Sequence, residues 1–100
     1  GGQALASLSS LGYGQTWQNL TGSRAVDTTY YNTTGRPISV SVIVQGAGTA
    51  IIMVNGISIY GGYANSTEYL SVNAIVPPGS SYSANTTVGI PSLASWSELR

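Results

Sequence analysis

Few side chains in this chain could carry out chemistry. Its 100 residues include three acids, Asp27, Glu68 and Glu98, three arginines, and no histidine, cysteine or lysine. Serine is abundant, but no histidine or lysine is present to activate it as a nucleophile. A glycosidase needs two carboxyl groups about 5 to 10 Å apart, and nothing in the sequence brings the acids together. We therefore predict that this segment is not an enzyme.

The same small set of ionisable residues limits which metals and nucleic acids the chain could bind. Without histidine or cysteine, and with dispersed carboxylates, neither a metal site nor a cofactor is predicted, although calcium held by carbonyl oxygens stays open. Nucleic-acid binding needs several cations against phosphates, whereas the formal net charge is zero. No run reaches the ~18 to 20 apolar residues of a membrane span, so membrane insertion is not expected. The class of protein that remains is a binding or structural module.

Alternating apolar and polar residues predict a β protein almost throughout. The clearest strand covers residues 36–45, where Ile38, Val40, Val42 and Val44 fall on one face. Asn55-Gly56 separates two apolar runs and is the pair typical of a type I′ hairpin turn. The predicted strands are residues 16–20, 25–31, 36–45, 50–54, 57–60, 70–76, 82–88 and 95–99.

Seven or eight strands with closely spaced turns favour an all-β fold, an antiparallel, jelly-roll-like β-sandwich. Residues 12–100 would form this domain. Residues 1–11 would be a short helical or irregular stub, because Ala4, Leu5, Leu8 and Leu11 have helical spacing. We interpret the stub as a link from a preceding domain and the chain as part of a longer protein.

Tyrosines are the candidates for ligand binding. Tyr60, Tyr63 and Asn65 lie in a glycine- and amide-rich segment that we predict to be a loop after the hairpin, with a composition that suits neutral glycans. The alternative is that Tyr60 caps the core and the glycines only turn the chain. Tyr30 and Tyr31 are adjacent, so one side chain of a strand faces inward and the other outward. Tyr31 is the fourth ligand candidate.

Other residues are predicted to have structural or interface roles. Trp17 and Trp96 are expected to cover opposite ends of the core or a subunit contact, with sugar stacking as the alternative. Tyr13 belongs to a Gly-Tyr-Gly entry that lets the backbone turn sharply beside a large ring. Four Asn-x-Ser/Thr triplets, at Asn19, Asn32, Asn65 and Asn85, formally match glycosylation acceptors. We interpret them as polar residues of turns and strand edges.

The arginines also favour structural roles. Arg24 lies three residues before Asp27, and Arg36 precedes a proline at the start of the clearest strand. An ion pair or contacts to carbonyl oxygens across an interface are expected ahead of recognition of an anionic glycan. Asp27 could equally take a turn hydrogen bond. Glu98 and Arg100 share one face of the last strand, where a pair would hold the chain end.

Five segments together have a family likeness: residues 12–21 (GYGQTWQNLT), Arg24, and residues 30–38 (YYNTTGRPI), 76–79 (VPPG) and 96–100 (WSELR). In order and spacing they resemble the C-terminal domain of tailed-bacteriophage tail fibre or tailspike proteins. Residues 45–73 resemble that family only in pattern. The resemblance implies a β-sandwich that closes the distal end of a homotrimeric fibre and serves trimer assembly, receptor contact, or both.

The expectation is therefore a virion protein of the phage tail, active outside the host cell. Its partners would be two further copies of itself and a host-surface polysaccharide or lipopolysaccharide. Two alternatives stay open: a trimerisation or folding cap without receptor contact, and a free-standing carbohydrate-binding module.

Overall fold

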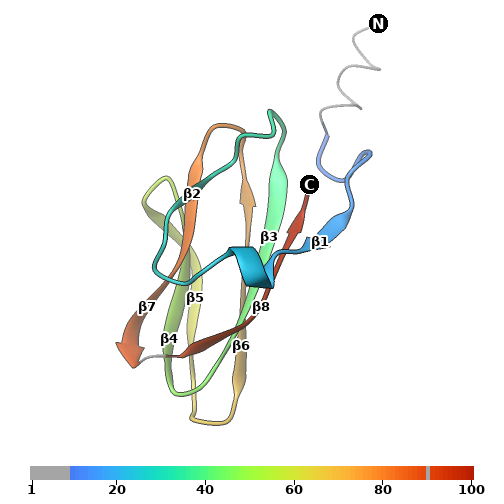
Figure 1. The fold of residues 1–100 in the computed structure, drawn as a ribbon. Helices are drawn as coiled ribbons and strands as arrows, with labels where there is room; N and C mark the ends of the chain where they lie inside the picture. The colour runs from blue at the N-terminus through green and yellow to red at the C-terminus, as the bar shows by residue number, and fades with distance from the viewer. Residues whose placement is uncertain (1–9, 90) are drawn as a thin grey trace, which may run out of the picture.

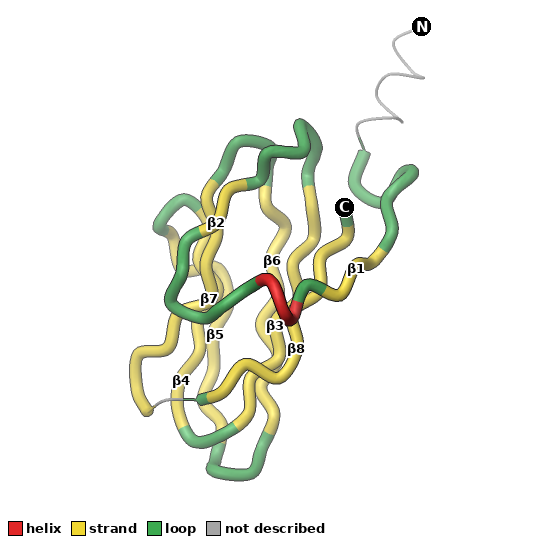
Figure 2. The backbone as a smooth tube through the Cα atoms, viewed as in Figure 1, coloured by secondary structure: helices red, strands yellow, loops and turns green. Residues whose placement is uncertain are grey.

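The computed structural model describes residues 10–89 and 91–100, which form strands joined by turns and one short 3₁₀ helix (Figures 1 and 2). Most of the predicted stub at residues 1–11 lies outside the described residues. None of the helices in the described ranges is long and apolar enough to cross a bilayer. The elements are β1 (Trp17–Asn19), η1 (Thr21–Ser23), β2 (Tyr30–Tyr31), β3 (Ile38–Gln45), β4 (Gly48–Val54), β5 (Ile57–Ala64), β6 (Tyr69–Val76), β7 (Ser81–Gly89) and β8 (Ser92–Leu99).

The strands form two antiparallel sheets packed face to face, in the orders β1-β8-β3-β6 and β2-β7-β4-β5. The first strand pairs with the last, the second with the last but one, and so on inward: β1 with β8, β2 with β7, β3 with β6, and β4 with β5. A long hairpin whose successive strand pairs alternate between two sheets is a jelly roll. The predicted fold class is confirmed.

The core lies between the sheets and follows the alternation of the sequence. In β3, Ile38, Val40, Val42 and Val44 are all buried, while the residues between them reach the surface. Trp96 of β8 is the largest fully buried side chain. The apolar faces of β4, β6 and β7 complete one cluster with these residues. The face predicted for the clearest strand is therefore confirmed.

The hairpin between β4 and β5 also has the predicted turn. Asn55 and Gly56 have φ angles of 53° and 76°, and positive φ at both central residues defines type I′. Because β5 continues beyond the turn to Ala64, the prediction of a loop over residues 60–66 was largely wrong. Its first half is strand, and only Asn65 and Ser66 lie in a turn.

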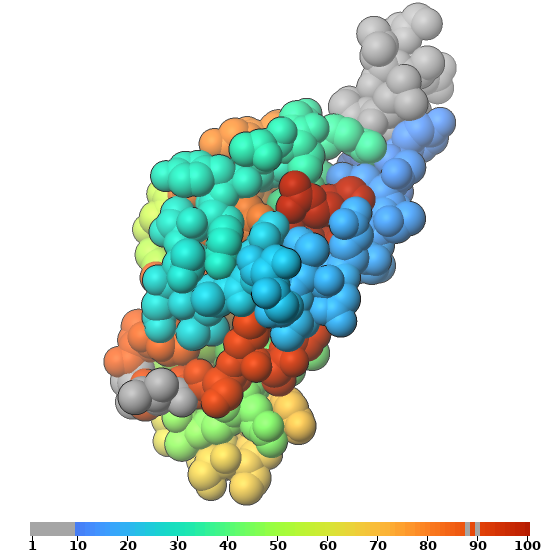
Figure 3. Space-filling view, viewed as in Figure 1, coloured from blue at the N-terminus to red at the C-terminus, as the bar shows by residue number. Residues whose placement is uncertain are grey.

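The strand predicted for residues 25–31 is reduced to Tyr30–Tyr31. Asp27 has a φ of 59°, which ends any extended run. Its carboxylate accepts hydrogen bonds of 2.8 Å from the backbone N–H and from the hydroxyl of Thr86. The segment is therefore a turn fixed to β7. Figure 3 shows the chain from β1 to β2, in blue to cyan, lying across the front of the sandwich.

Two of the Asn-x-Thr triplets form the same turn. The Oδ1 of Asn19 accepts hydrogen bonds from the N–H and the hydroxyl of Thr21, and the Oδ1 of Asn32 accepts the same pair from Thr34. Side-chain turns of this kind are typical of asparagine. Asn32 is also buried, and its Nδ2 donates to the carbonyl oxygens of Arg36 and Val76. The interpretation as turn residues is confirmed for these two positions.

Candidate functional site

A shallow groove of about 510 Å³ lies over β4 and β5, in the second sheet. Its volume falls within the range of small-ligand sites, roughly 300 to 1,000 Å³. The lining residues come only from these two strands: Thr49, Ile51, Ser58, Ile59, Tyr60, Gly61, Gly62 and Tyr63. The groove is therefore formed by two paired strands and not by a loop.

Local features of β5 shape the groove. Gly61 lies opposite Ile51, and a Cβ on it would come within 2.9 Å of Ile51 Cγ1 and 3.0 Å of the Ala50 carbonyl oxygen. The glycine thus leaves room for the Ile51 side chain. One step along, the register shifts so that Tyr60 and Ser58 oppose consecutive residues of β4, which makes Ile59 the extra residue of a β-bulge. Bulges bend a strand and re-aim its side chains.

The chemistry of the lining is apolar and uncharged. The side chains of Ile59, Tyr60 and Tyr63 are 50, 54 and 63% exposed, respectively. Thr49 and Ser58 add hydroxyl groups, which both donate and accept hydrogen bonds. Apolar and aromatic surface with a few hydroxyls suits a neutral ligand that has both an apolar face and hydroxyl groups.

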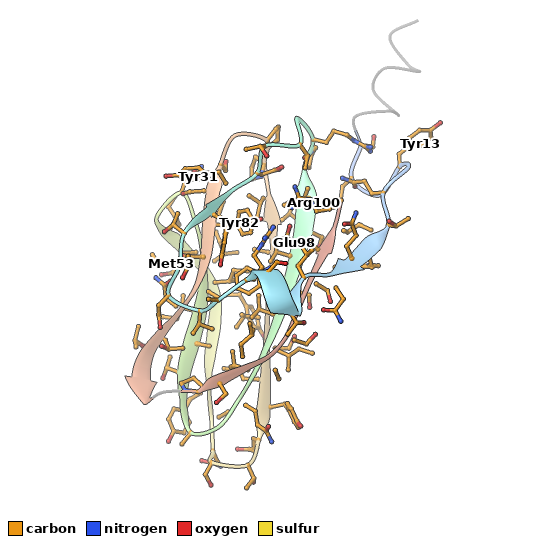
Figure 4. The ribbon with its side chains drawn as sticks, in the orientation of Figure 1. Tyr13, Tyr31, Met53, Tyr82, Glu98 and Arg100 are labelled. Atoms are coloured by element: carbon orange, nitrogen blue, oxygen red, sulfur yellow. The ribbon has the colours of Figure 1, made fainter. Side chains whose placement is uncertain are left out.

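Of the four predicted ligand residues, Tyr60 and Tyr63 line this groove. Their side chains point to opposite faces of β5, because Tyr63 lies opposite Thr49 on the outer face and Tyr60 lies opposite the buried Ile52. Tyr31 lies on β2, at the opposite edge of the same sheet (Figure 4). Asn65 lies in the turn after β5, where its N–H donates to Glu68 Oε1 at 2.8 Å. Neither Tyr31 nor Asn65 lines the groove. Tyr60 lies opposite the buried Ile52 and is 54% exposed. The alternative in which the glycines only turn the chain is wrong, because Gly61 and Gly62 lie within β5.

Sequence analysis missed the β4 side of the groove and the bulge. Thr49 and Ile51 were placed near or in the strand before the hairpin, but not at a site. A signal for them existed: an Asn-Gly hairpin fixes which residues of its two strands lie opposite each other. Counting outward from the turn puts Ile51 opposite Tyr60, one residue away from the observed partner Gly61, because the bulge at Ile59 shifts the register.

The predicted structural residues divide into buried and exposed. Trp96 is fully buried, as expected of a core residue, whereas Trp17 is 56% exposed and does not cover the core. Tyr13 projects from the entry segment away from the sandwich (Figure 4). Trp17 is exposed because β1 is an edge strand that places this side chain on the outer face of the sheet, opposite Leu99.

Arg36 binds carbonyl oxygens of its own chain. Its guanidinium donates to the carbonyl of Ser10 at 2.7 Å and to that of Tyr13. The contacts to carbonyl oxygens are thus within the chain and not across an interface as expected, and they hold the entry segment against the start of β3.

A buried carboxylate joins the two sheets beside the chain end. Glu98 is fully buried and accepts hydrogen bonds from Arg24 Nε at 3.1 Å, Arg100 Nη1 at 2.8 Å, Trp96 Nε1 at 2.9 Å and Tyr82 Oη at 2.9 Å. Figure 4 shows Tyr82, Glu98 and Arg100 grouped in the middle of the sandwich. The pairing of Glu98 with Arg100 is confirmed.

The ion pair expected between Arg24 and Asp27 was wrong, because Arg24 pairs with Glu98 instead. The guanidinium of Arg24 also lies 4.7 Å from the ring centroid of Tyr30. That ring meets the indole of Trp96 edge-on at 5.6 Å. The ion pair therefore forms one packed unit with two aromatic rings.

The carboxylate is held in its charged form. Burial raises the pKa of Glu98, but the hydrogen bonds from Arg24, Trp96 and Tyr82 outweigh it, so the pKa lies below its usual value. Burial raises the pKa of Tyr82, and the hydrogen bond to Glu98 raises it further. The ordinary and lowered pKa of Glu98 define the pH range over which the cluster loses its stabilising effect.

We expect acid to destabilise the fold through Glu98. A lowered pKa contributes stability that is complete above the ordinary value of 4.5 and is lost as the pH falls through the lower folded value. Urea unfolding between pH 7 and pH 2.5 measures this. The free energy of unfolding should fall further on acidification in the wild type than in Glu98→Gln, which lacks the titrating group. Equal losses in the two proteins would contradict the assignment.

Each acid in the part of the chain that the structure describes accepts hydrogen bonds from its own set of donors. Asp27 accepts from Thr86, Glu68 accepts from Asn65, and Glu98 is buried among donors. No group of three His, Cys, Asp or Glu residues that could hold a metal ion occurs within residues 10–89 and 91–100. The groove is thus the feature with the geometry of a ligand site.

Comparison with protein-family models, with curated proteins and with solved structures gave no match for this chain.

Proposed function

We propose that this chain is a non-catalytic attachment domain that binds a neutral glycan in the groove over β4 and β5. In the full assembly it is the distal domain of a phage tail fibre or tailspike, forms a homotrimer, and contacts polysaccharide or lipopolysaccharide of the bacterial surface. The observation that carries the proposal is the uncharged groove with the exposed ring of Tyr63 on its outer face.

The groove supports a sugar ligand because of what it combines. A sugar ring has an apolar face that packs against aromatic and aliphatic side chains, which Tyr63, Ile51 and Ile59 of the lining supply here. The hydroxyls of Thr49 and Ser58 supply hydrogen-bond partners. Because no lining residue is charged, sugars without carboxylate or phosphate groups are the matching class.

The sheet supports attachment because it holds these side chains in place. Tyr60 and Tyr63 are on a strand that pairs along its length with β4, and β4 pairs in turn with β7. Tyrosine offers a large contact area at low conformational-entropy cost. A site on rigid strands therefore loses little entropy when it binds.

The family likeness supports the fibre context through residues that meet in space. Arg24, Tyr30, Trp96, Glu98 and Arg100 come from three of the resembling segments, and they form the cluster around the buried carboxylate. The other four residues of this set thus surround Glu98, the one buried carboxylate among the described residues. The groove lies in the stretch where the likeness is only one of pattern, as a variable receptor site would.

Replacing Tyr63 by alanine should weaken glycan binding by at least about tenfold, because stacking on an aromatic ring is lost. The binding can be measured on a glycan array or on host cells with the domain as it stands. Tyr31→Ala is the matched control, since Tyr31 is 64% exposed and Tyr63 63%. It removes an equally exposed ring from the same sheet but outside the groove.

The outcomes separate the alternatives. If Tyr63→Ala loses glycan binding and Tyr31→Ala retains it, the groove is supported as the binding site. Equal glycan binding by both variants and the wild type contradicts this assignment. A trimer that binds no glycan and no host cell would favour the folding-cap alternative. Glycan binding by a stable monomer would favour a free-standing carbohydrate-binding module.

A further inference from the structure

The outer face of the first sheet presents apolar side chains to the surface. The register of β1, β8, β3 and β6 places Trp17, Leu99, Ser39 and Ile75 in one row across it, since directly opposed residues of antiparallel strands share a face. Trp17 and Ile75 are 56 and 60% exposed. The row therefore ends in a large, half-exposed side chain on each edge strand.

The next row is made of hydroxyl and amide groups. Asn19, Ser97, Ser41 and Asn73 lie side by side by the same register. Each of these side chains both donates and accepts hydrogen bonds. A second copy of the same row can therefore meet it without leaving a donor or an acceptor unpaired.

Charge is missing from this face. None of the outward-facing residues of the four strands is charged, because Glu98 of β8 points inward and the arginines lie outside the strands. The surfaces of soluble monomers are usually about a quarter to a third charged residues. Two identical faces without charge meet with no like-charge repulsion and with no ion left unpaired.

We propose that copies of this chain associate with one another through the outer face of the β1-β8-β3-β6 sheet. This inference rests on the homotrimer proposed above and names the surface that forms it: three copies of the face would surround the threefold axis, each in contact with both of its neighbours. It leaves the groove on the opposite sheet free for a ligand. One domain would then assemble with one sheet and bind with the other.

The size of the face agrees with this role. Three strands of eight residues and one of three, at about 4.8 Å spacing and about 3.3 Å per residue, present on the order of 400 Å². Three such faces around one axis bury on the order of 1,200 Å² in all, comparable with the area of a specific interface. An apolar row beside a polar row also gives the contact a fixed direction.

The test places one charge at the β6 end of the apolar row. Ile75→Arg should weaken self-association at least about a hundredfold, because its guanidinium would be buried without a partner. Ile57→Arg is the matched control: Ile57 is 62% exposed and Ile75 60%, but Ile57 lies in the other sheet. Asn73→Arg, in the adjacent row, is a second variant. Sedimentation of the chain and a thermal melt of each variant give the mass and the folding.

The expected result is an oligomeric wild type and Ile57→Arg variant, with both face variants folded and of single-chain mass. Oligomers that persist in both face variants would overturn the assignment of the surface but leave the proposed homotrimer intact. A wild type that is monomeric at all concentrations would overturn both. A folded Ile75→Arg variant that keeps its mass but loses glycan binding would assign the face to the ligand, and overturn the inference.

Discussion

Glu98→Gln is expected to lower the free energy of unfolding by about 3 to 5 kcal/mol, the usual cost of breaking a buried ion pair. Glutamine matches the size of glutamate, but its amide turns one acceptor into a donor. The site holds donors from Arg24, Arg100, Trp96 and Tyr82. One of them would face another donor, and the two guanidinium groups, only 16 and 22% exposed, would lose their counter-ion.

Urea unfolding at pH 7 measures this loss, which would be a large part of the roughly 5 to 15 kcal/mol that holds most domains together. Glu68→Gln is the matched control, because Glu68 is the other glutamate of the chain and lies exposed in the turn after β5. It should change stability by less than about 1 kcal/mol. Similar small changes in both variants would show that the buried carboxylate does not stabilise the fold.

Local patterns in the sequence predicted most of the fold. The alternation in residues 38–44 identifies the buried face of β3, and Asn55-Gly56 identifies the hairpin turn. Both signals depend only on residues close in the sequence. The jelly-roll pairing itself was not predicted in this way. Only β4 and β5 are consecutive strands that pair, and every other pair joins strands far apart in the chain.

The errors arose where tertiary contacts override local composition. Tyr60-Gly61-Gly62-Tyr63 has the composition of a loop, but Gly61 leaves room for Ile51, and a Cβ on Gly62 would lie 3.1 Å from Leu70 Cδ1. The glycines are there for packing between strands. Composition alone cannot separate this use of glycine from a turn, because both require a missing side chain.

Contacts between residues far apart in the chain could not be predicted from the sequence either. Arg24 has an acid three residues away in Asp27, yet its partner Glu98 is 74 residues distant. The choice depends on how β8 and the segment after β1 come together, which no local pattern contains. For the same reason only two of the four predicted ligand residues, Tyr60 and Tyr63, line the groove.

Asn32→Ala should lower the free energy of unfolding by about 2 to 4 kcal/mol, because buried groups would lose their hydrogen-bond partners. The amide of Asn32 donates to the carbonyl oxygens of Arg36 at 2.6 Å and Val76 at 2.9 Å. These bonds join the turn before β3 to the end of β6. Its Oδ1 also accepts from the N–H and hydroxyl of Thr34.

Asn19→Ala isolates the buried part of this effect. Asn19 makes the same turn with Thr21 but is exposed, so its loss should cost only about 0.5 to 1 kcal/mol. The difference between the two variants in urea unfolding then measures the two buried amide hydrogen bonds together. If both variants lost the same amount, the shared turn would account for all of it, and Asn32 would contribute nothing by joining the turn to β6.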